Sequence, residues 1–283
     1  MMKRFKLFIK GKSIPTFILC VVFVVIAIFP IYWMIISSVM TSADIMSKTP
    51  PLVPLWDKLS FSSYVDIFTR YNIWGWIRNT VVIVFFATIL SLAMSVMAGY
   101  SLSRYHSKGQ FAIGIFLLLN KMLPTTLLLI PLYIMFSKMQ LTNSFFAVVL
   151  ADIINIIPFT TWMMKGFFDE IPSELDESAK IDGCTNFRAF VSIMLPLTAP
   201  GLAANGIYAF IQAWSDYING RTLLTASSKW TITMGASSFI GEHSVSWSNL
   251  MAMGIVAIIV PFIMFVFMER FLVSGMTAGA VKG

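Results

Sequence analysis

Residues 174–200, ELDESAKIDGCTNFRAFVSIMLPLTAP, form a polar segment that leads into an apolar one, and long hydrophobic stretches lie on both sides. Ser173 precedes the acidic part, and Asp176 three residues later resembles a capping box. The acids that fall in the first helical turns, where the helix dipole favours negative charge, are Glu174, Asp176 and Glu177. Gly183 stands where a helix end needs left-handed dihedral angles. We therefore predict two short helices joined at a glycine, which project as a stiff unit.

The amino-acid composition indicates the surroundings of this segment. The chain has 283 residues, of which 58% are hydrophobic and 12% charged, and its mean hydropathy is +0.82. Soluble domains carry roughly 25% charged residues, so the composition favours a membrane protein. Cys20 lies in an apolar run and Cys184 in the acidic segment, which argues against a disulfide framework. His106 and His243 are isolated, so we predict no metal site and no catalytic residue.

The net charge of +7 does not indicate nucleic-acid binding, because of where the charges lie. Basic residues without any acid among them precede the first apolar run: Lys3, Arg4, Lys6, Lys10 and Lys12. This positive-inside pattern predicts that residues 1–16 are cytoplasmic. The charge-free run at residues 13–43 exceeds the about 7–15 residues of a signal-peptide core and is long enough to span a membrane.

Six stretches are apolar enough to cross a membrane as helices, which takes about 20 residues each. They are residues 17–40, 80–102, 111–136, 145–167, 199–217 and 250–273. An even number of spans places the C-terminal residues 274–283 in the cytoplasm with the N-terminus, and the distribution of Lys and Arg agrees. The expected fold is an all-α membrane protein with six transmembrane helices, in a single transmembrane domain of residues 1–283.

Two long connecting segments are expected outside, and residues 169–198 with the acidic segment are expected in the cytoplasm. Residues 41–79 include Trp56, Trp74 and Trp76, which suit an interfacial aromatic belt or a ligand site. Residues 219–249 are rich in Ser, Thr and Gly and are too long for a simple connector. This second segment fits a lid or docking surface, and it also fits a passive loop.

Polar residues and prolines interrupt the later spans. The polar ones are Lys121, Asp152, Asn155, Gln212 and Asp216. Charged groups are costly in hydrocarbon, so these are expected to face the bundle interior or an aqueous cavity. Lys121 and Asp152 fit either a structural ion pair or a translocation path. Pro124 and Pro131 break helical hydrogen bonding in the third span.

The segment ESAKIDGCTNFRAFVSIMLPLTAP resembles the coupling-loop signature of ABC importer permeases, in which E-A-A is followed by D-G, a phenylalanine and L-P. The matching residues are Glu177, Ala179, Asp182, Gly183, Phe190, Leu195 and Pro196, and Ser178 replaces the central alanine. AGYSLSRY and IPLYIMFSKMQLTNS look like the carbohydrate-uptake branch, and the C-terminal GMTAGAVKG resembles the maltose-type second permease. The resemblance covers nearly the whole chain.

The resemblance implies the type I importer permease fold in a bacterial cytoplasmic membrane, and a heterodimer with a homologous second permease. It implies that the coupling loop docks on a dimer of cytoplasmic ATPase subunits, through Glu177, Ser178, Ala179, Asp182 and Gly183. It also implies a tail contact with the ATPase at Gly275, Met276, Thr277, Ala278 and Gly279, and an extracytoplasmic sugar-binding protein that contacts residues 219–249. Because the chain has no P-loop, ATP and Mg are expected on the partner subunits and no cofactor on this chain.

Sugars are bound by neutral polar groups and aromatic faces. Candidates along the substrate path are Asn155, Asn205, Tyr208, Gln212, Trp214 and Tyr217. Ordinary hydrogen bonds between helices would explain the same residues, and this is the favoured interpretation from the sequence. Relatives often carry W-N-E-F near the end of the fifth span, whereas this chain has Trp214-Ser215-Asp216-Tyr217.

Two other functions remain open. The same machinery would carry a phosphorylated polyol or an oligosaccharide acid if Lys121 served an anion. A self-contained secondary transporter or channel is the alternative from another class, although such proteins often show internal repeats and the chain shows no convincing one.

Overall fold

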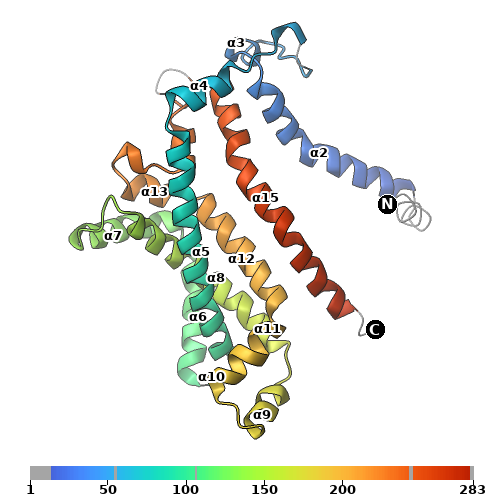
Figure 1. Cartoon of the computed structure of the whole chain (residues 1–283), viewed down its shortest axis with the longest axis vertical. Helices are drawn as coiled ribbons and strands as arrows, with labels where there is room; N and C mark the ends of the chain where they lie inside the picture. Colours follow the sequence, from blue (N-terminus) through green and yellow to red (C-terminus); the bar gives the residue numbers. More distant parts are fainter. Residues whose placement is uncertain (1–13, 54–55, 106, 242–244, 281–283) are drawn as a thin grey trace. The chain divides into compact units, whose positions relative to one another are not determined.

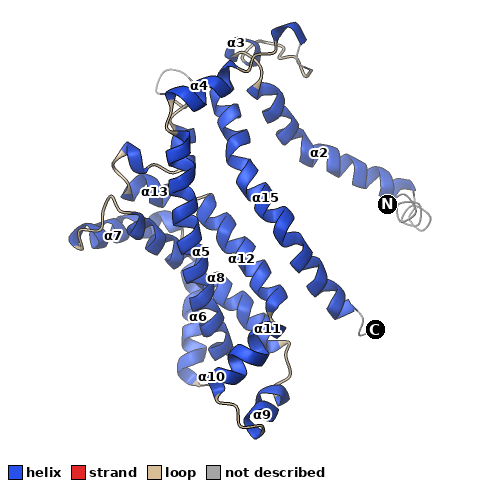
Figure 2. Ribbon diagram, in the orientation of Figure 1, coloured by secondary structure: helices blue, strands red, loops and turns tan. Residues whose placement is uncertain are grey.

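The computed structural model describes residues 14–53, 56–105, 107–241 and 245–280. Every regular element in this part is helical (Figure 2), and one isolated bridge joins Ile240 to Val245. The expected all-α class is confirmed. Residues 1–13 of the basic N-terminus lie outside the described residues, as do His106 and His243.

Four helices are long and apolar enough to cross a membrane: α2 (Ile14–Ser38), α5 (Ile73–Arg104), α8 (Phe145–Asp169) and α15 (Trp247–Ala280). Two bent pairs bring the number to six when each pair counts as one span. They are α6 (Lys108–Met122) with α7 (Thr125–Lys138), and Asn186–Leu197 with α12 (Ala199–Trp214).

The third span, expected over residues 111–136, consists of two helices. A capping box between Ser107 and Gln110 starts α6, which ends at Met122. Leu123 is extended, with φ −75° and ψ 133°, because the ring of Pro124 disfavours helical dihedral angles in the residue before it. The chain therefore turns by 103° between α6 and α7, at one of the two prolines expected to break helical hydrogen bonding in this span.

The second span begins at Ile73 rather than at Thr80, because the side chain of Asn72 accepts a hydrogen bond from the Gly75 N–H at 3.2 Å and caps the helix. The predicted loop at residues 41–79 is correspondingly shorter. Trp76 is 4% exposed and its ring lies 6.4 Å from that of Trp230, so its assignment to an interfacial belt is wrong.

The chain forms two compact units, residues 1–71 with 236–256, and residues 72–235 with 257–283. The first unit contains α2, α3 (Ser42–Ile45), η1 (Trp56–Lys58), α4 (Ser62–Arg70) and the start of α15. The hydroxyls of Ser42 and Ser248 lie 2.6 Å apart, and those of Ser38 and Tyr64 lie 2.8 Å apart. Most of α2 is exposed, as expected for a helix surrounded by lipid.

The second unit is built around α5 and α8, which run side by side (Figure 1). One face of α5 carries small buried residues at every fourth position: Ala87, Ser91, Ser95 and Gly99. The hydroxyl of Ser95 lies 2.5 Å from that of Thr160. A Cβ at Gly99 would lie 2.8 Å from the Met164 Cβ and 2.9 Å from the Lys165 nitrogen. Small residues thus allow close helix packing, as is common in membranes.

A buried cluster near the C-terminal end of α5 joins this helix pair to the acidic segment. Its members are Val96, Met164, Phe168 and Met194. The ring of Tyr100 packs on it, 5.4 Å from Phe168 and 4.8 Å from Phe190. This cluster positions the segment that the sequence singled out.

Candidate functional site

The acidic segment contains the two predicted helices. The first, α9 (Glu174–Ile181), ends in a Schellman motif. The Gly183 N–H donates to the carbonyl of Lys180 at 3.0 Å, and the Cys184 N–H donates to that of Ala179 at 2.9 Å. Gly183 has φ +82°, which confirms the predicted left-handed glycine.

The second helix starts from Thr185, whose hydroxyl accepts a hydrogen bond from the Arg188 N–H at 3.3 Å. It runs through α10 (Asn186–Ala189), one π-helical turn (Phe190–Met194) and α11 (Leu195–Leu197). Thr198 follows, and the chain then bends by 77° into α12. Short helices with defined ends make the segment a fixed projection and not a flexible linker.

The predicted capping box at Ser173 is wrong. Ser173 has helical dihedral angles, φ −64° and ψ −22°, and its side chain makes no capping hydrogen bond. A capping side chain reaches the helix N–H groups from extended dihedral angles. Asp176 instead turns inward to Arg104 and Tyr100.

The outward side of the segment is partly apolar. Glu177, Ser178, Asp182 and Gly183 are exposed, whereas Ala179 is only 3% exposed. Ile181 is 85% and Phe187 is 74% exposed. We call Glu177, Ile181, Asp182 and Phe187 the coupling surface. Its two apolar members were not predicted, although large apolar residues in a polar loop are a usable signal of docking.

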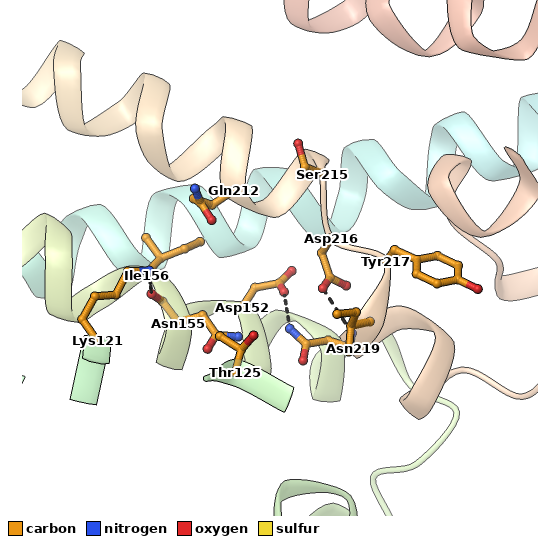
Figure 3. A pocket seen from close by; sticks show the side chains of 11 residues that line it. Lys121, Thr125, Asp152, Asn155, Ile156, Gln212, Ser215, Asp216, Tyr217 and Asn219 are labelled. Atoms are coloured by element: carbon orange, nitrogen blue, oxygen red, sulfur yellow. Dashed lines mark hydrogen bonds between the residues drawn. The ribbon is translucent and has the colours of Figure 1, made fainter. Parts of the chain in front are cut away.

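A polar cavity of about 380 Å³ lies among α8, the α6–α7 bend, the end of α12 and α13 (Ile218–Leu223) (Figure 3). Its lining residues are Lys121, Thr125, Asp152, Asn155, Ile156, Gln212, Ser215, Asp216, Tyr217, Ile218 and Asn219. Acidic side chains outnumber basic ones in this lining, and amide or hydroxyl groups make up much of the rest.

The two carboxylates of the cavity are held differently. Asp152 is 3% exposed, and its Oδ1 accepts a hydrogen bond from Nδ2 of Asn219 at 3.0 Å. Its Oδ2 has no partner among the described residues. Asp216 accepts hydrogen bonds from the N–H groups of Asn219 and Gly220, at 3.2 Å and 2.9 Å, and so fixes the start of α13. Asp152 therefore retains a free acceptor in a polar cavity.

Lys121 does not pair with Asp152 in the described part of the chain. Its Nζ lies 3.5 Å from the carbonyl oxygen of Asn155. Lys121 lies in the last turn of α6, and its Nζ approaches a backbone carbonyl instead of a carboxylate. The structural ion pair with Asp152 that the sequence left open is therefore wrong. Lys121, Asp152 and Asp216 nevertheless line one cavity, as expected for charged residues within membrane helices.

Residues 93–278 match the sequence pattern of the family described as binding-protein-dependent transport system inner membrane component. The chain belongs to this family. The permease is 31% identical over 259 residues to the arabinooligosaccharides transport system permease protein AraQ of Halalkalibacterium halodurans, covering 91% of this chain and 92% of that protein. It is 30% identical to the diacetylchitobiose uptake system permease protein DasC of Streptomyces coelicolor, covering 96% and 98%.

The fold of the permease is similar to that in the crystal structure of a bacterial ABC transporter involved in the import of the acidic polysaccharide alginate. The TM-score is 0.76 at 20% identity, covering 91% of this chain and 95% of that chain. By its family, the chain is a multi-pass inner-membrane permease component of a binding-protein-dependent ABC transport system, and not the ATPase of that system.

The predicted substrate-path residues of the permease fall into two groups. Asn155, Gln212 and Tyr217 line the cavity. The other three lie elsewhere: Nδ2 of Asn205 donates to the Gly201 carbonyl within α12 at 3.0 Å, the Tyr208 ring lies 4.4 Å from that of Phe159 in α8, and Nε1 of Trp214 donates to the Ala257 carbonyl of α15 at 3.2 Å.

Sequence reasoning missed Thr125, Ser215 and Asn219 as cavity residues of the permease. The first follows the break at Pro124, and the others follow the end of α12. Polar residues beside a break in a membrane helix are the signal that points to them, because irregular backbone at membrane depth lines cavities.

The predicted tail residues of the permease form the last turns of α15. They are Gly275, Met276, Thr277, Ala278 and Gly279, and their side chains lie outside the described part. Their contact with the ATPase stays a prediction.

Proposed function

We propose that this permease is one of two homologous membrane subunits that import a neutral oligosaccharide at the expense of ATP hydrolysed by partner subunits. The observation that carries this proposal is the cavity in which Asp152, Asn155 and Gln212 offer carboxylate and amide groups. Such groups suit sugar hydroxyls, which both donate and accept hydrogen bonds. The names of the relatives, which refer to arabinooligosaccharides and diacetylchitobiose, support the same class of substrate.

Asn155, Gln212 and Tyr217 are the substrate-path residues retained in this proposal, and Asp152 is added to them. Asp152, whose Oδ2 has no partner among the described residues, is proposed to accept a hydrogen bond from a sugar hydroxyl. This hydrogen bond and those from the amides of Asn155 and Gln212 would orient the solute together.

An anionic cargo, such as a phosphorylated polyol, is disfavoured by the same cavity. Lys121 would attract an anion, but Asp152 and Asp216 line the cavity beside it. Like charges in a poorly solvated site repel strongly.

The ATPase pair, which binds ATP and Mg, is proposed to receive the coupling surface of α9 and α10. Glu177 and Asp182 supply charge, and Ile181 and Phe187 supply apolar contact. Ser178, Ala179 and Gly183 shape the helix and its end. The ATPase pair has two states that bind ATP with different affinity, so ATP binding shifts the pair toward one of them. Through the coupling surface, this shift changes the arrangement of the membrane helices.

The topology completes the proposal. Residues 1–16, 169–198 and 274–283 are cytoplasmic, and residues 41–79 and 219–249 are external. The second external segment receives the sugar-binding protein. The tail at Gly275, Met276, Thr277, Ala278 and Gly279 contacts the ATPase.

The test is uptake by proteoliposomes that contain the assembled complex, with binding protein outside and ATP inside. Labelled mono-, di- and trisaccharides and one oligosaccharide acid are compared at equal concentration. We expect ATP-dependent uptake of a neutral oligosaccharide. Uptake of the acid alone would refute the neutral class, and uptake by the permease without ATPase would favour a self-contained transporter.

A further inference from the structure

An ion pair joins α9 to the end of α5. Nε of Arg104, in the last turn of α5, lies 2.5 Å from Oδ2 of Asp176 in the first turn of α9. The side chains are 12% and 7% exposed, respectively. The hydroxyl of Tyr100, one turn earlier in α5, donates to Oδ1 of Asp176 at 3.0 Å. Both carboxylate oxygens are therefore bound by α5.

The same arginine also holds the segment that leads into α9. Nη2 of Arg104 donates to the carbonyl oxygen of Ile171 at 2.9 Å, and it lies 3.7 Å from the sulfur of Met194 in the π-helical turn. The planar guanidinium thus contacts the entry to α9, α9 itself and the segment after α10. A lysine ammonium lacks this planar arrangement of N–H donors, so it could not make all of these contacts at once.

No other side chain of α9 hydrogen-bonds to the rest of the described chain. Of its residues, only Asp176 and Ala179 are buried, and Ala179 has no side-chain polar group. The coupling surface faces away from the bundle, whereas Asp176 faces into it. The polar link between α9 and the membrane helices is therefore this carboxylate, which acts beside the apolar packing of Ala179 and the short backbone connections at the ends of α9.

We propose that Arg104, Asp176 and Tyr100 form a latch that makes α9 and the end of α5 move as one body, so that Arg104 and Asp176 are positioning residues for coupling ATP hydrolysis to transport. The proposal rests on the proposed docking of α9 on the ATPase. A buried charge without its partner is strongly unfavourable, so the pair stays intact while α9 is displaced. Without the latch, α9 would still dock, but its movement would be lost in the backbone connections.

The test compares Arg104→Ala, Asp176→Asn and the exchanged pair Arg104→Asp/Asp176→Arg in the full complex. Asp169→Asn is the matched control, because its partner Lys165 lies in the same helix and their ion pair joins no two elements. Subunit level in the membrane, cross-linking of Cys184 to a cysteine on the ATPase, ATP hydrolysis and uptake are measured together.

We expect both single variants to keep the cross-link and ATP hydrolysis, while uptake per ATP falls by about tenfold, within the usual range of coupling between two sites. The exchanged pair should recover part of the lost uptake per ATP. The conservative variant Arg104→Lys should retain more uptake per ATP than Arg104→Ala, but less than the wild type. Wild-type uptake per ATP in Arg104→Ala would overturn the latch. So would an equal loss in Asp169→Asn, or a loss explained entirely by lower subunit level. Absence of the cross-link in the wild type would instead refute the docking of α9.

Discussion

The side-chain nitrogen Nδ2 of Asn79 lies 3.0 Å from the carbonyl oxygen of Trp230, a residue far away in the sequence. The same nitrogen donates to the carbonyl of Ser228 at 2.9 Å, and Asn79 is fully buried. At the next residue, the hydroxyl of Thr80 accepts a hydrogen bond from the Ile232 N–H at 2.8 Å. The start of α5 thereby fixes a segment that the sequence left open as a passive loop.

Replacing Asn79 by alanine should loosen the segment at residues 228–230, because two carbonyl groups lose their donor. Each lost hydrogen bond costs about 0.5–1.5 kcal/mol net. If this segment receives the binding protein, ATP hydrolysis should require roughly tenfold more binding protein for half-maximal stimulation. An unchanged stimulation curve would argue that the segment is passive. Asn72→Ala, which alters only the cap of α5, is the control.

Gly183 should tolerate substitution poorly, although there is room for a side chain at this position. Nothing lies within 4 Å of a Cβ built on Gly183, so alanine would meet only the strain of φ +82°, about 1–2 kcal/mol. Proline would additionally remove the N–H that donates to Lys180. We expect reduced uptake for Gly183→Ala and none for Gly183→Pro, with the subunit still in the membrane. Gly166→Ala, in open space within α8, should be neutral.

Reversing the charge of Glu177 should abolish uptake without removing the subunit from the membrane, because the proposed ATPase contact would become repulsive. Glu174 is also exposed in the first turn of α9, so Glu174→Lys has the same effect on the helix dipole. Measured uptake should be lost in Glu177→Lys and retained in Glu174→Lys. Equal losses of uptake in the two variants would show that the interaction of Glu177 with the helix dipole, and not its contact with the ATPase, accounts for the effect.

Neutralising Asp152 should weaken solute binding to the cavity. The Asp152→Asn variant keeps the shape but replaces one carboxyl oxygen acceptor with an amide donor, and we expect roughly 10- to 100-fold weaker binding of a neutral saccharide. Equilibrium dialysis of the complex with labelled sugar, without binding protein, measures this. Asn205→Ala, which lies outside the cavity, is the comparison. Tighter binding by Asp152→Asn would instead favour an anionic cargo.

The close packing of α5 on α8 should make Gly99 sensitive to a single methyl group. A Cβ there would lie 2.9 Å from backbone of Lys165, which cannot turn away. Overpacking typically costs about 1–3 kcal/mol, so Gly99→Ala should lower the unfolding temperature in detergent. Gly114→Ala, whose Cβ would lie 3.6 Å from Trp162, should have little effect. Equal unfolding temperatures would contradict this packing.

Local sequence signals predicted much of this structure. Long apolar stretches identified the spans, and Gly183 identified the end of α9 because few other residues adopt its dihedral angle. The bend at Leu123 was less predictable, since a proline in a membrane helix is compatible with a straight span when neighbours satisfy the freed groups. Pro131, in the interior of α7, is such a case in the same region.

The candidate sites were predicted only where the residues are contiguous. The coupling residues follow from one motif, but Asp176 looked like a capping residue and is instead bound to Arg104, far away in the sequence. Likewise, nothing local distinguishes Gln212, which lines the cavity, from Asn205, which does not. These assignments depend on which helices meet, and that depends on long-range packing.

Among the four helices of spanning length in the described part, α5 alone has no internal proline; the others contain Pro30, Pro158 and Pro261. Its 32 residues extend over about 48 Å, against a hydrocarbon thickness of about 30 Å. One end carries Asn79 and the other Arg104. A continuous helix of this length is longer than the hydrocarbon layer is thick, so with the proposed topology the arrival of cargo outside and nucleotide turnover inside would act on the same stiff element.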